Sequence, residues 1–372
     1  MMIGWILEGN AFAKKPILGK SCSAYVREAM EELELVLIHD REELTASTAE
    51  RVLVVRGDAP CLTGITLNGL AQAAAERPCV LLSPDANTPL AIAISREALQ
   101  RVMCAQPALL SAERLVAAMN ECGEAPRVWY DDLAETYLTV TDAQSYAEAF
   151  QIINRAAILR HQENGVIILD PARTIIEDDV RIGAGTLIYA GNTLQGRTVI
   201  GENCVLYPNN RMQNAAVGDE TTVESSVLLD CAVGRCTTVG PYAYLRPNSH
   251  VGDHCRIGDF VEIKNSSIDD GTKVSHLTYV GDSDLGKEIN LGCGVVFVNY
   301  DGKTKNRSKV EDHAFIGCNC NLVAPVHIGK NAYLAAGSTV VEDVPEDALF
   351  VARSRGVTKA DWVKRRKDVG KL

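Results

Sequence analysis

Residues 176–206 read IEDDVRIGAGTLIYAGNTLQGRTVIGENCVL and carry an aliphatic side chain at every sixth position. The same spacing returns in later runs that begin at Val233, Ile268, Leu285 and Ile316. So many aliphatic residues in one register do not arise by chance. The pattern therefore determines the fold of the second half of the chain.

A period of six matches neither the α-helix, which repeats about every 3.6 residues, nor the simple alternation of a β-strand. It fits a solenoid in which each coil has three short strands joined by turns, with one aliphatic side chain per strand pointing inward. Neighbouring coils stack like neighbouring strands, about 4.8 Å apart, and no coil can bury its core alone. We therefore predict a hexapeptide-repeat parallel β-helix over residues 166–345.

The register is irregular around one histidine. The steps 263–268 and 280–285 are five residues long rather than six, and they lie on either side of His276. The repeat is also interrupted before Ile316 by a polar segment, residues 299–307. Irregularities in a solenoid often mark the face that binds ligands, so we expect these to identify a site.

The first 145 residues have a different organisation. Apolar runs alternate with stretches of helical periodicity, which predicts an α/β domain with a mostly parallel sheet. Strands are expected at 4–7, 51–55 and 91–94, and helices at 95–103 and 111–119. We further expect a linker helix within residues 146–165 and a C-terminal tail over residues 346–372.

Asp58 follows an expected strand, where α/β sheets bind their ligands. Two interpretations of this residue are open. Asp58 either binds a metal or nucleotide, or its carboxylate caps the following turn. The first strand leads into Gly9 and then bulky residues, whereas a phosphate-binding turn needs several glycines for close backbone approach. This domain therefore looks unsuited to nucleotide chemistry.

Composition narrows the functional classes. The chain has 372 residues and a net charge of −11, which argues against binding nucleic acid or anionic membranes. The sequence lacks a membrane-spanning run and a secretory signal, so a cytoplasmic location is expected. The twelve cysteines are interpreted as buried free thiols, with disulfides or metal ligation as the alternative.

Several longer motifs resemble one protein family. They are 242–247 (YAYLRP), 258–264 (GDFVEIK), 276–282 (HLTYVGD), 299–305 (NYDGKTK) and 322–326 (LVAPV). In order and spacing they are similar to the bacterial bifunctional glucosamine-1-phosphate N-acetyltransferase and N-acetylglucosamine-1-phosphate uridyltransferase family. The resemblance covers residues 165–353 and implies a left-handed β-helix, a homotrimer with sites between subunits, and acetyl-CoA as donor.

The resemblance also implies roles for individual residues. His276 matches the general base. Arg246 and Lys264 match sugar-phosphate ligands, and Tyr279 and Asn290 match residues beside them. Lys305 matches a phosphate contact that reaches in from the adjacent subunit. The acetyl-CoA contacts match Asn299, Tyr300, Ala336 and Arg353, together with Cys293 and Cys318, which stand where the family has alanine and serine. The departures imply modestly weaker coenzyme binding.

The resemblance of the N-terminal part is fragmentary. The glycine-rich signature of the uridyltransferase is absent near residue 10, and Thr141 replaces the asparagine that helps the carboxylate equivalent to Asp58 hold magnesium. The resemblance thus implies a reduced nucleotidyltransferase-like domain that has lost uridyl transfer, with Mg²⁺ needed only if that site is active.

The chemistry of the expected site can be stated from its residue types. A glucosamine phosphate carries an ammonium group that must lose a proton before it attacks a thioester, and histidine, with a pKa of about 6.5, is suited to accept it. Guanidinium and ammonium groups suit a phosphate. The alternative is that His276 is structural and that Arg246 and Lys264 are ordinary surface charges.

Other readings remain open at this point. Zinc shared between subunits would need histidines such as His250, His254 and His313, but an i, i+4 pair shares a face on a helix and not in β structure, so no metal site is expected. Competing functions are an acyltransferase for another amino-sugar, a nucleotidyltransferase forming UDP-N-acetylglucosamine, and an inert trimeric scaffold.

Overall fold

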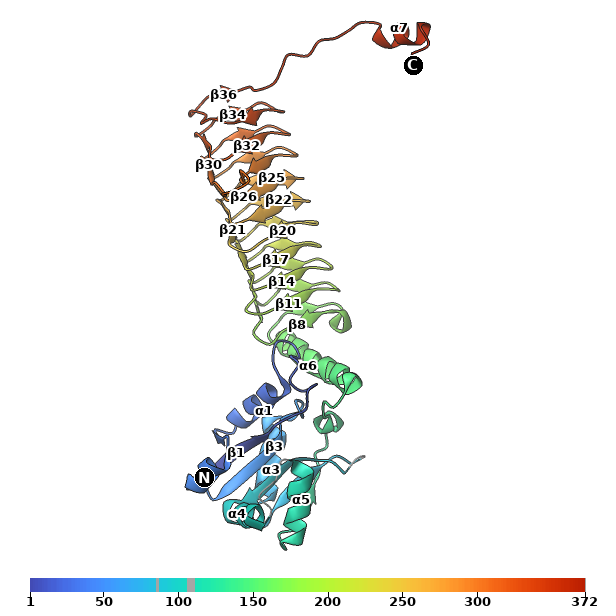
Figure 1. Cartoon of the computed structure of the whole chain (residues 1–372), viewed down its shortest axis with the longest axis vertical. Helices are drawn as coiled ribbons and strands as arrows, with labels where there is room; N and C mark the ends of the chain where they lie inside the picture. Colours follow the sequence, from blue (N-terminus) through green and yellow to red (C-terminus); the bar gives the residue numbers. More distant parts are fainter. Residues whose placement is uncertain (85–86, 106–110, 372) are drawn as a thin grey trace. The chain divides into compact units, whose positions relative to one another are not determined.

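The computed structural model describes residues 1–84, 87–105 and 111–371, so the final residue of the expected tail lies outside the described residues. The chain forms two compact units (Figure 1). One consists of Met1–Glu163 and Ile175–Asp178, and the other of Asn164–Thr174 and Asp179–Leu372. Each unit is described by itself.

The first unit is an α/β fold. Its strands are β1 (Met2–Leu7), β2 (Val36–Ile38), β3 (Arg51–Arg56), β4 (Cys79–Leu82), β5 (Pro89–Ser95), β6 (Arg127–Trp129) and the short β8 (Ile175–Ile176). Its helices are α1 (Cys22–Glu31), α2 (Arg41–Ala46), α3 (Gly64–Ala73), α4 (Arg96–Ala105), α5 (Ala112–Glu121), the 3₁₀ turn η1 (Ala134–Tyr137) and α6 (Ala143–Glu163). The main sheet has the order β2-β1-β3-β5-β4-β6. Only β5 among these strands is antiparallel to its neighbours.

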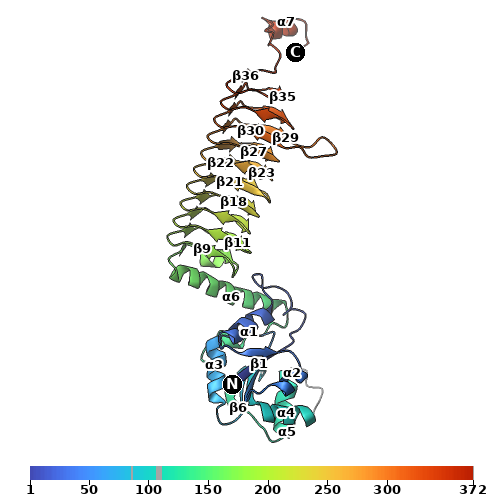
Figure 2. The same cartoon turned by 90° about the vertical axis from the view of Figure 1, so that its left-hand side faces the viewer.

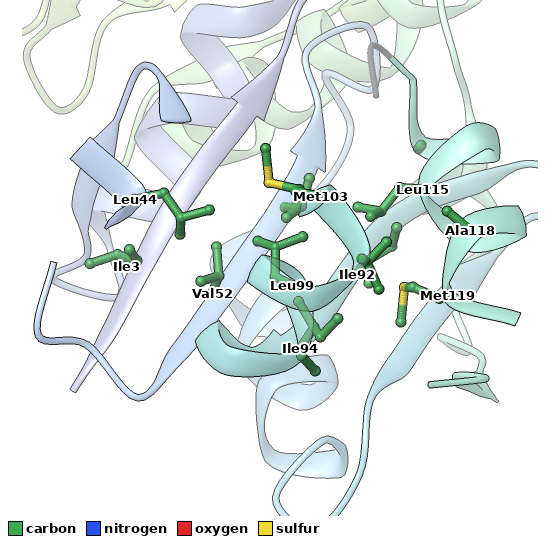
Figure 3. Packing of buried hydrophobic residues seen from close by; sticks show 14 of the residues in the cluster. Ile3, Leu44, Val52, Ile92, Ile94, Leu99, Met103, Leu115, Ala118 and Met119 are labelled. Atoms are coloured by element: carbon green, nitrogen blue, oxygen red, sulfur yellow. The ribbon is translucent and has the colours of Figure 1, made fainter. Parts of the chain in front are cut away.

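Helices cover both faces of this sheet. On one face Leu99 and Met103 of α4 and Leu115 of α5 pack with Val52 and Ile92 of the sheet (Figure 3). On the other face α1 and α3 contribute a second buried cluster. The first six residues of β5 are all buried, because the strand is covered on both sides. The predicted α/β class is confirmed.

The second unit is a solenoid with three parallel sheets, one along each side (Figure 1). The first sheet contains β7 (Ile167–Ile168), β10 (Leu187–Ile188), β13 (Val205–Leu206), β16 (Thr222–Val223), β19 (Thr238–Val239), β22 (Arg256–Asp259), β25 (Lys273–His276), β28 (Asn290–Leu291), β31 (Phe315–Ile316), β34 (Tyr333–Leu334) and β36 (Leu349–Phe350). The second contains β11 (Thr193–Gln195), β14 (Arg211–Gln213), β17 (Val227–Leu229), β20 (Tyr244–Leu245), β23 (Glu262–Lys264), β26 (Tyr279–Gly281), β29 (Val296–Val298), β32 (Asn321–Val323) and β35 (Thr339–Val340). The third contains β9 (Arg181–Ile182), β12 (Val199–Ile200), β15 (Ala216–Val217), β18 (Cys231–Val233), β21 (Ser249–Val251), β24 (Ser267–Ile268), β27 (Ser283–Leu285), β30 (Ser308–Val310) and β33 (His327–Ile328).

The periodic aliphatic residues form the core of the solenoid. Ile188, Leu194, Leu245, Ile263 and Leu334 are each fully buried, and each stacks on its equivalents in the adjoining coils. The predicted left-handed, hexapeptide-repeat β-helix class is confirmed. Among the periodic aliphatic residues of 176–206, only Ile182 is not fully buried.

Five-residue steps are not confined to the neighbourhood of His276. The inward residues Met212, Val217, Val223, Leu228 and Val233 are all buried, and three of the four steps between them contain five residues. The expectation that short steps single out the site is therefore wrong. A corner can lose a residue without moving the inward side chains, because a left-handed residue turns the chain there.

The interruption after Phe297 is a loop between β29 and β30, which projects from the stack beside β29 (Figure 2). The inward register resumes at Val310, which is buried, rather than at Ile316. The loop thus adds residues at one corner and leaves the stacking of the coils intact. After β36 every described residue is exposed, and the chain forms the short helix α7 (Trp362–Asp368) near its end.

None of the helices in the described part of the chain has the length and apolar character needed to cross a membrane.

Candidate active site

One corner of the solenoid places five side chains in a single column, which we call the His276 column: Asp259, His276, Cys293, Cys318 and Ala336. The residue after each member donates its backbone N–H to the carbonyl of the member on the preceding coil. These bonds are Leu277 N to Asp259 O (2.9 Å), Gly294 N to His276 O (3.4 Å), Asn319 N to Cys293 O (2.8 Å) and Gly337 N to Cys318 O (2.8 Å). Three of the predicted donor-site residues therefore lie on the coils that follow the predicted base.

His276 is held by a carboxylate from the preceding coil. Its Nδ1 lies 2.6 Å from Oδ1 of Asp259, and the two side chains are 49% and 37% exposed. The hydrogen bond with His276 is the main reason that the pKa of Asp259 is lowered. An Nδ1–H that donates to this carboxylate leaves the Nε2 lone pair open to solvent, as a general base requires.

Sequence reasoning gave Asp259 no role. The signal was nevertheless present, because Asp259 and His276 are 17 residues apart, as are the inward residues Ile257 and Val274 of the same two coils. Counting along the column rather than along the chain would have paired them.

The predicted phosphate ligands lie on the adjoining side of the solenoid. Arg246 and Lys264 follow the paired residues Leu245 and Ile263, so they lie side by side on successive coils. Arg246 Nη1 donates to Glu262 Oε1 at 2.7 Å, and this hydrogen bond is the main reason that the pKa of Arg246 is raised. Glu262, also missed from the sequence, orients the guanidinium.

Asp282 connects the phosphate ligands to the projecting loop. This buried carboxylate accepts from Asn265 Nδ2 at 2.5 Å and from the side chain of Asn299, and Lys264 Nζ lies 3.8 Å away. Burial would raise the pKa of Asp282, but the two amides and the nearby lysines lower it. Asn299 Nδ2 also lies 3.4 Å from the Tyr279 hydroxyl, so Asp282 brings Lys264, Tyr279 and Asn299 together.

Lys305 approaches Lys264 within a single chain. The pKa of Lys264 is below the usual lysine value, mainly because of the Lys305 ammonium group and secondly because of burial. Two ammonium groups repel unless an anion lies between them. Asp282 supplies part of that charge, and a phosphate dianion would supply more.

The loop that carries Lys305 is internally fastened. Asp301 accepts hydrogen bonds from Lys303 N (2.8 Å), Thr304 N (2.7 Å) and the Thr304 hydroxyl (2.7 Å), which lower its pKa. Tyr300 and Lys305 also form an antiparallel bridge. The Tyr300 hydroxyl donates to the Gly302 carbonyl at 2.8 Å, so this side chain serves the loop itself in the structure.

The remaining predicted coenzyme ligands extend the His276 column. Arg353 donates to the Ala336 carbonyl, which ties the start of the C-terminal tail to the last member of the column.

Asn290 lies on the coil of Cys293 and pairs with Lys273 and Phe315 of β25 and β31. No hydrogen bond joins Asn290 to the other predicted site residues in the described part of the chain.

A second column of the same corner is apolar and exposed. Tyr242, Phe260 and Leu277 are 60%, 56% and 57% exposed, and all three adopt the left-handed conformation, which bulky residues rarely do. The rings of Tyr242 and Phe260 stack at 5.4 Å. These residues border the His276 column on its C-terminal side along the chain.

In the α/β unit Asp58 is already paired. Arg56 donates to both of its oxygens at 2.8 Å, and Asp58 is 5% exposed. A cavity of about 380 Å³ lies nearby at the ends of β1 and β2, with Lys14, Arg27 and His39 in its wall. Asp58 does not line this cavity, so the structural reading of its carboxylate is the better one.

The histidines considered for zinc are not grouped. His313 Nδ1 pairs with Glu288 at 3.1 Å, and His276 pairs with Asp259. Over residues 1–84, 87–105 and 111–371 there is no group of three or more potential metal-ligating side chains.

Comparisons with known proteins find similarity over parts of the chain. Residues 230–265 and 307–341 match the family model described as bacterial transferase hexapeptide (six repeats). Proteins named bifunctional protein GlmU are 50% identical over 229 residues in Clostridium kluyveri and 51% identical over 226 residues in Acetivibrio thermocellus. These alignments cover 62% and 61% of this chain. The chain spans about half the length of the curated relatives it matches, 50% and 49% respectively.

Solved structures resemble the chain more remotely. The UDP-N-acetylglucosamine acyltransferase of Francisella novicida is 17% identical with a TM-score of 0.35, and the match covers 55% of this chain and 74% of that one. A 4-diphosphocytidyl-2C-methyl-D-erythritol synthase from Anaerococcus prevotii is 8% identical with a TM-score of 0.33, over 41% and 98% of the two chains.

Proposed function

We propose that this chain, an acyltransferase of the hexapeptide-repeat type and similar over 62% of its length to a bifunctional GlmU protein, acetylates glucosamine 1-phosphate with acetyl-CoA as donor. The observation that carries the proposal is the hydrogen bond of 2.6 Å between His276 and Asp259. Arg246, Lys264 and Lys305 add a set of basic side chains that suits a phosphate. The product would be N-acetylglucosamine 1-phosphate, and the reaction would take place in the cytoplasm.

His276 acts as the general base. Its Nδ1–H donates to Asp259, and its Nε2 accepts a proton from the substrate ammonium group or from the amine as it attacks. The amine nitrogen forms a bond to the thioester carbonyl carbon, the carbon–sulfur bond breaks, and coenzyme A leaves as a thiol. Asp259 keeps the ring in one tautomer and stabilises the imidazolium that forms.

Arg246 and Lys264 bind the phosphate together with Lys305, which the resemblance assigns to the adjacent subunit and which approaches Lys264 within one chain in the structure. Glu262 holds the guanidinium of Arg246 at 2.7 Å, and Asp282 lies 3.8 Å from the Lys264 ammonium. A phosphate dianion would relieve the repulsion between Lys264 and Lys305. Tyr279 and Asn290 flank the sugar in this arrangement.

The acetyl-CoA side consists of Cys293, Asn299, Tyr300, Cys318, Ala336 and Arg353. Cys293, Cys318 and Ala336 follow His276 along its column, and Arg353 is bound to the Ala336 carbonyl. The thioester would therefore lie along the corner, with its carbonyl near His276 and its nucleotide end toward the tail.

We also propose a homotrimer. The exposed column of Tyr242, Phe260 and Leu277 supports this, because three bulky apolar side chains in a strained conformation are costly unless another surface covers them. Light scattering should give a trimer mass, and Phe260→Asp should lower that mass. A monomeric parent protein would contradict the proposal.

Uridyl transfer is proposed to be lost. The guanidinium of Arg56 neutralises the carboxylate that a magnesium site would need. Incubation with UTP, N-acetylglucosamine 1-phosphate and Mg²⁺ should release no pyrophosphate above the level without enzyme. Release that Asp58→Ala abolishes would show that the site is active.

The main test measures thiol release from acetyl-CoA with a panel of amino-sugar phosphates. Glucosamine 1-phosphate should give the highest kcat/KM. A preference for another amino-sugar would change the substrate assignment. No thiol release with any amino-sugar would favour the scaffold reading.

A further inference from the structure

Two of the twelve cysteines occupy equivalent positions on adjoining coils. Leu291 pairs with Ile316 in the register of β28 and β31, which aligns Cys293 with Cys318 two residues further on. Asn319 N donates to the Cys293 carbonyl at 2.8 Å, which confirms the alignment at the corner itself. Among the described residues of the solenoid, no other two cysteines are stacked in this way.

Stacked coils place equivalent Cα atoms about 4.8 Å apart, within the range of about 4.4–6.8 Å that disulfides span. Side chains in this column also reach one another. Asp259 and His276, which lie two coils and one coil before Cys293 in the column, approach to 2.6 Å. A thiol on each of two adjoining coils is therefore positioned to react with the other.

Both thiols are open to reagents. Cys318 is exposed and Cys293 is half-buried, whereas Cys204, Cys255 and Cys320 of the same solenoid are buried. Burial raises the pKa of Cys255 to about 11, and a thiol of that kind is nearly inert. The stacked cysteines are the accessible, closely spaced thiols of the proposed donor side.

We propose that Cys293 and Cys318 are a dithiol that forms a reversible disulfide, and that the disulfide closes the acyl-donor side of the site. The effect on donor binding rests on the proposed function, whereas the disulfide itself does not. A low-molecular-weight disulfide is the oxidant. One thiolate attacks a sulfur of that disulfide and releases a thiol, and the second then attacks the mixed disulfide, releasing another thiol and leaving the Cys293–Cys318 bond.

The consequence for the donor follows from the place of the pair. The two sulfurs lie between His276 and Ala336 in the column, along the path assigned to the thioester and the pantetheine arm. A covalent bond would draw the coils together at this corner and replace two small, adaptable side chains with a fixed one. Reduction would restore the open column.

The test uses the full-length protein incubated with oxidised glutathione, followed by mass spectrometry of the intact chain and of its peptides. We expect loss of two hydrogen atoms and a cross-linked peptide pair containing Cys293 and Cys318. Acetyl-CoA binding, measured by calorimetry, should be lost on oxidation and recovered with dithiothreitol.

Variants separate the possible outcomes. Cys318→Ser and, independently, Cys293→Ala should give no cross-link, and oxidation should not change the donor affinity that each variant shows when reduced. Cys236→Ser, which alters a cysteine without a stacked partner, should cross-link like the parent protein. If both cysteines instead remain free or carry two separate glutathione adducts, the dithiol proposal is wrong.

A cross-link that forms without any loss of donor binding would contradict the gating step. If the reduced enzyme shows no acetyl transfer but the cross-link forms, the proposed function fails and the dithiol survives.

Discussion

Each of the two units contains an aspartate with a close hydrogen-bonding partner, but the two partners have opposite chemical consequences. In the α/β unit Asp58 is buried and receives two hydrogen bonds of 2.8 Å from Arg56. In the solenoid Asp259 is partly exposed and pairs at 2.6 Å with His276. A guanidinium stays charged at all ordinary pH values and fills both oxygens, whereas an imidazole can exchange its proton. The first pairing neutralises a carboxylate, whereas the second orients an imidazole.

Removing the imidazole should give the largest effect. We expect His276→Ala to lower kcat for acetyl transfer by about 10²- to 10⁴-fold, the usual contribution of a positioned general base. The side chain is half-exposed, so thermal unfolding should be unchanged. His276→Gln is the control that keeps the volume without the base, and near-normal turnover in either variant would mean that the base lies elsewhere.

Replacing the carboxylate partner of His276 should give the second-largest effect on kcat. Asp259→Asn preserves shape but favours the wrong imidazole tautomer, so we expect kcat to fall about 10- to 100-fold, less than for a fully buried dyad. The loss should appear in kcat rather than in KM for acetyl-CoA. Asp253→Asn, which alters another exposed aspartate of the solenoid, is the control. Equal losses in both variants would indicate a general structural effect.

The two pairings should also differ in what they contribute to stability. Arg56→Ala leaves a buried carboxylate without its partner, so the α/β unit should lose about 3 kcal/mol of unfolding free energy. Arg101→Ala, which breaks an exposed pair with Glu124, should cost less than about 1 kcal/mol. Acetyl transfer should be unaffected by Arg56→Ala while the protein is folded, and equal destabilisation by both variants would contradict the structural role of Asp58.

A smaller effect should appear in the pH dependence of substrate binding. The pKa of Lys264 is lowered mainly by Lys305, so its positive charge is lost at a lower pH than for an ordinary lysine. We expect kcat/KM for the sugar phosphate to decline on the alkaline side as Lys264 loses its proton. Lys305→Ala removes the cause and should move that decline to higher pH. Lys303→Ala is the matched control, and an unshifted profile in the Lys305 variant would show that another group titrates.

The fold was largely accessible from the sequence, because the inward aliphatic residues of the solenoid recur at intervals of mostly six and sometimes five residues. The strands 51–55 and 91–94 and the helices near them were also recovered, since burial on both faces gives continuous apolar runs. The antiparallel direction of β5 was not predicted, because an apolar run looks the same in either direction.

Site residues that stand in long motifs could be found, whereas their partners could be found only by counting along the columns of stacked coils. Glu262 and Asp282 are ordinary acidic residues in the sequence, and their roles depend on side chains one coil away. The bond between Asp259 and His276 would have needed the coil length at that point, which varies around the solenoid. The short steps taken as markers of the site were misleading, because corners elsewhere lose residues as readily.

The hydrogen bonds that Asp301 accepts within the projecting loop have an energetic consequence for phosphate binding. Ordering one backbone residue costs about 1–2 kcal/mol, and a ligand that must order a loop loses that amount from its affinity. Here three hydrogen bonds from Lys303 and Thr304 fix the turn in advance. Lys305 can therefore meet a phosphate from a pre-organised position, and most of its electrostatic attraction remains available as affinity.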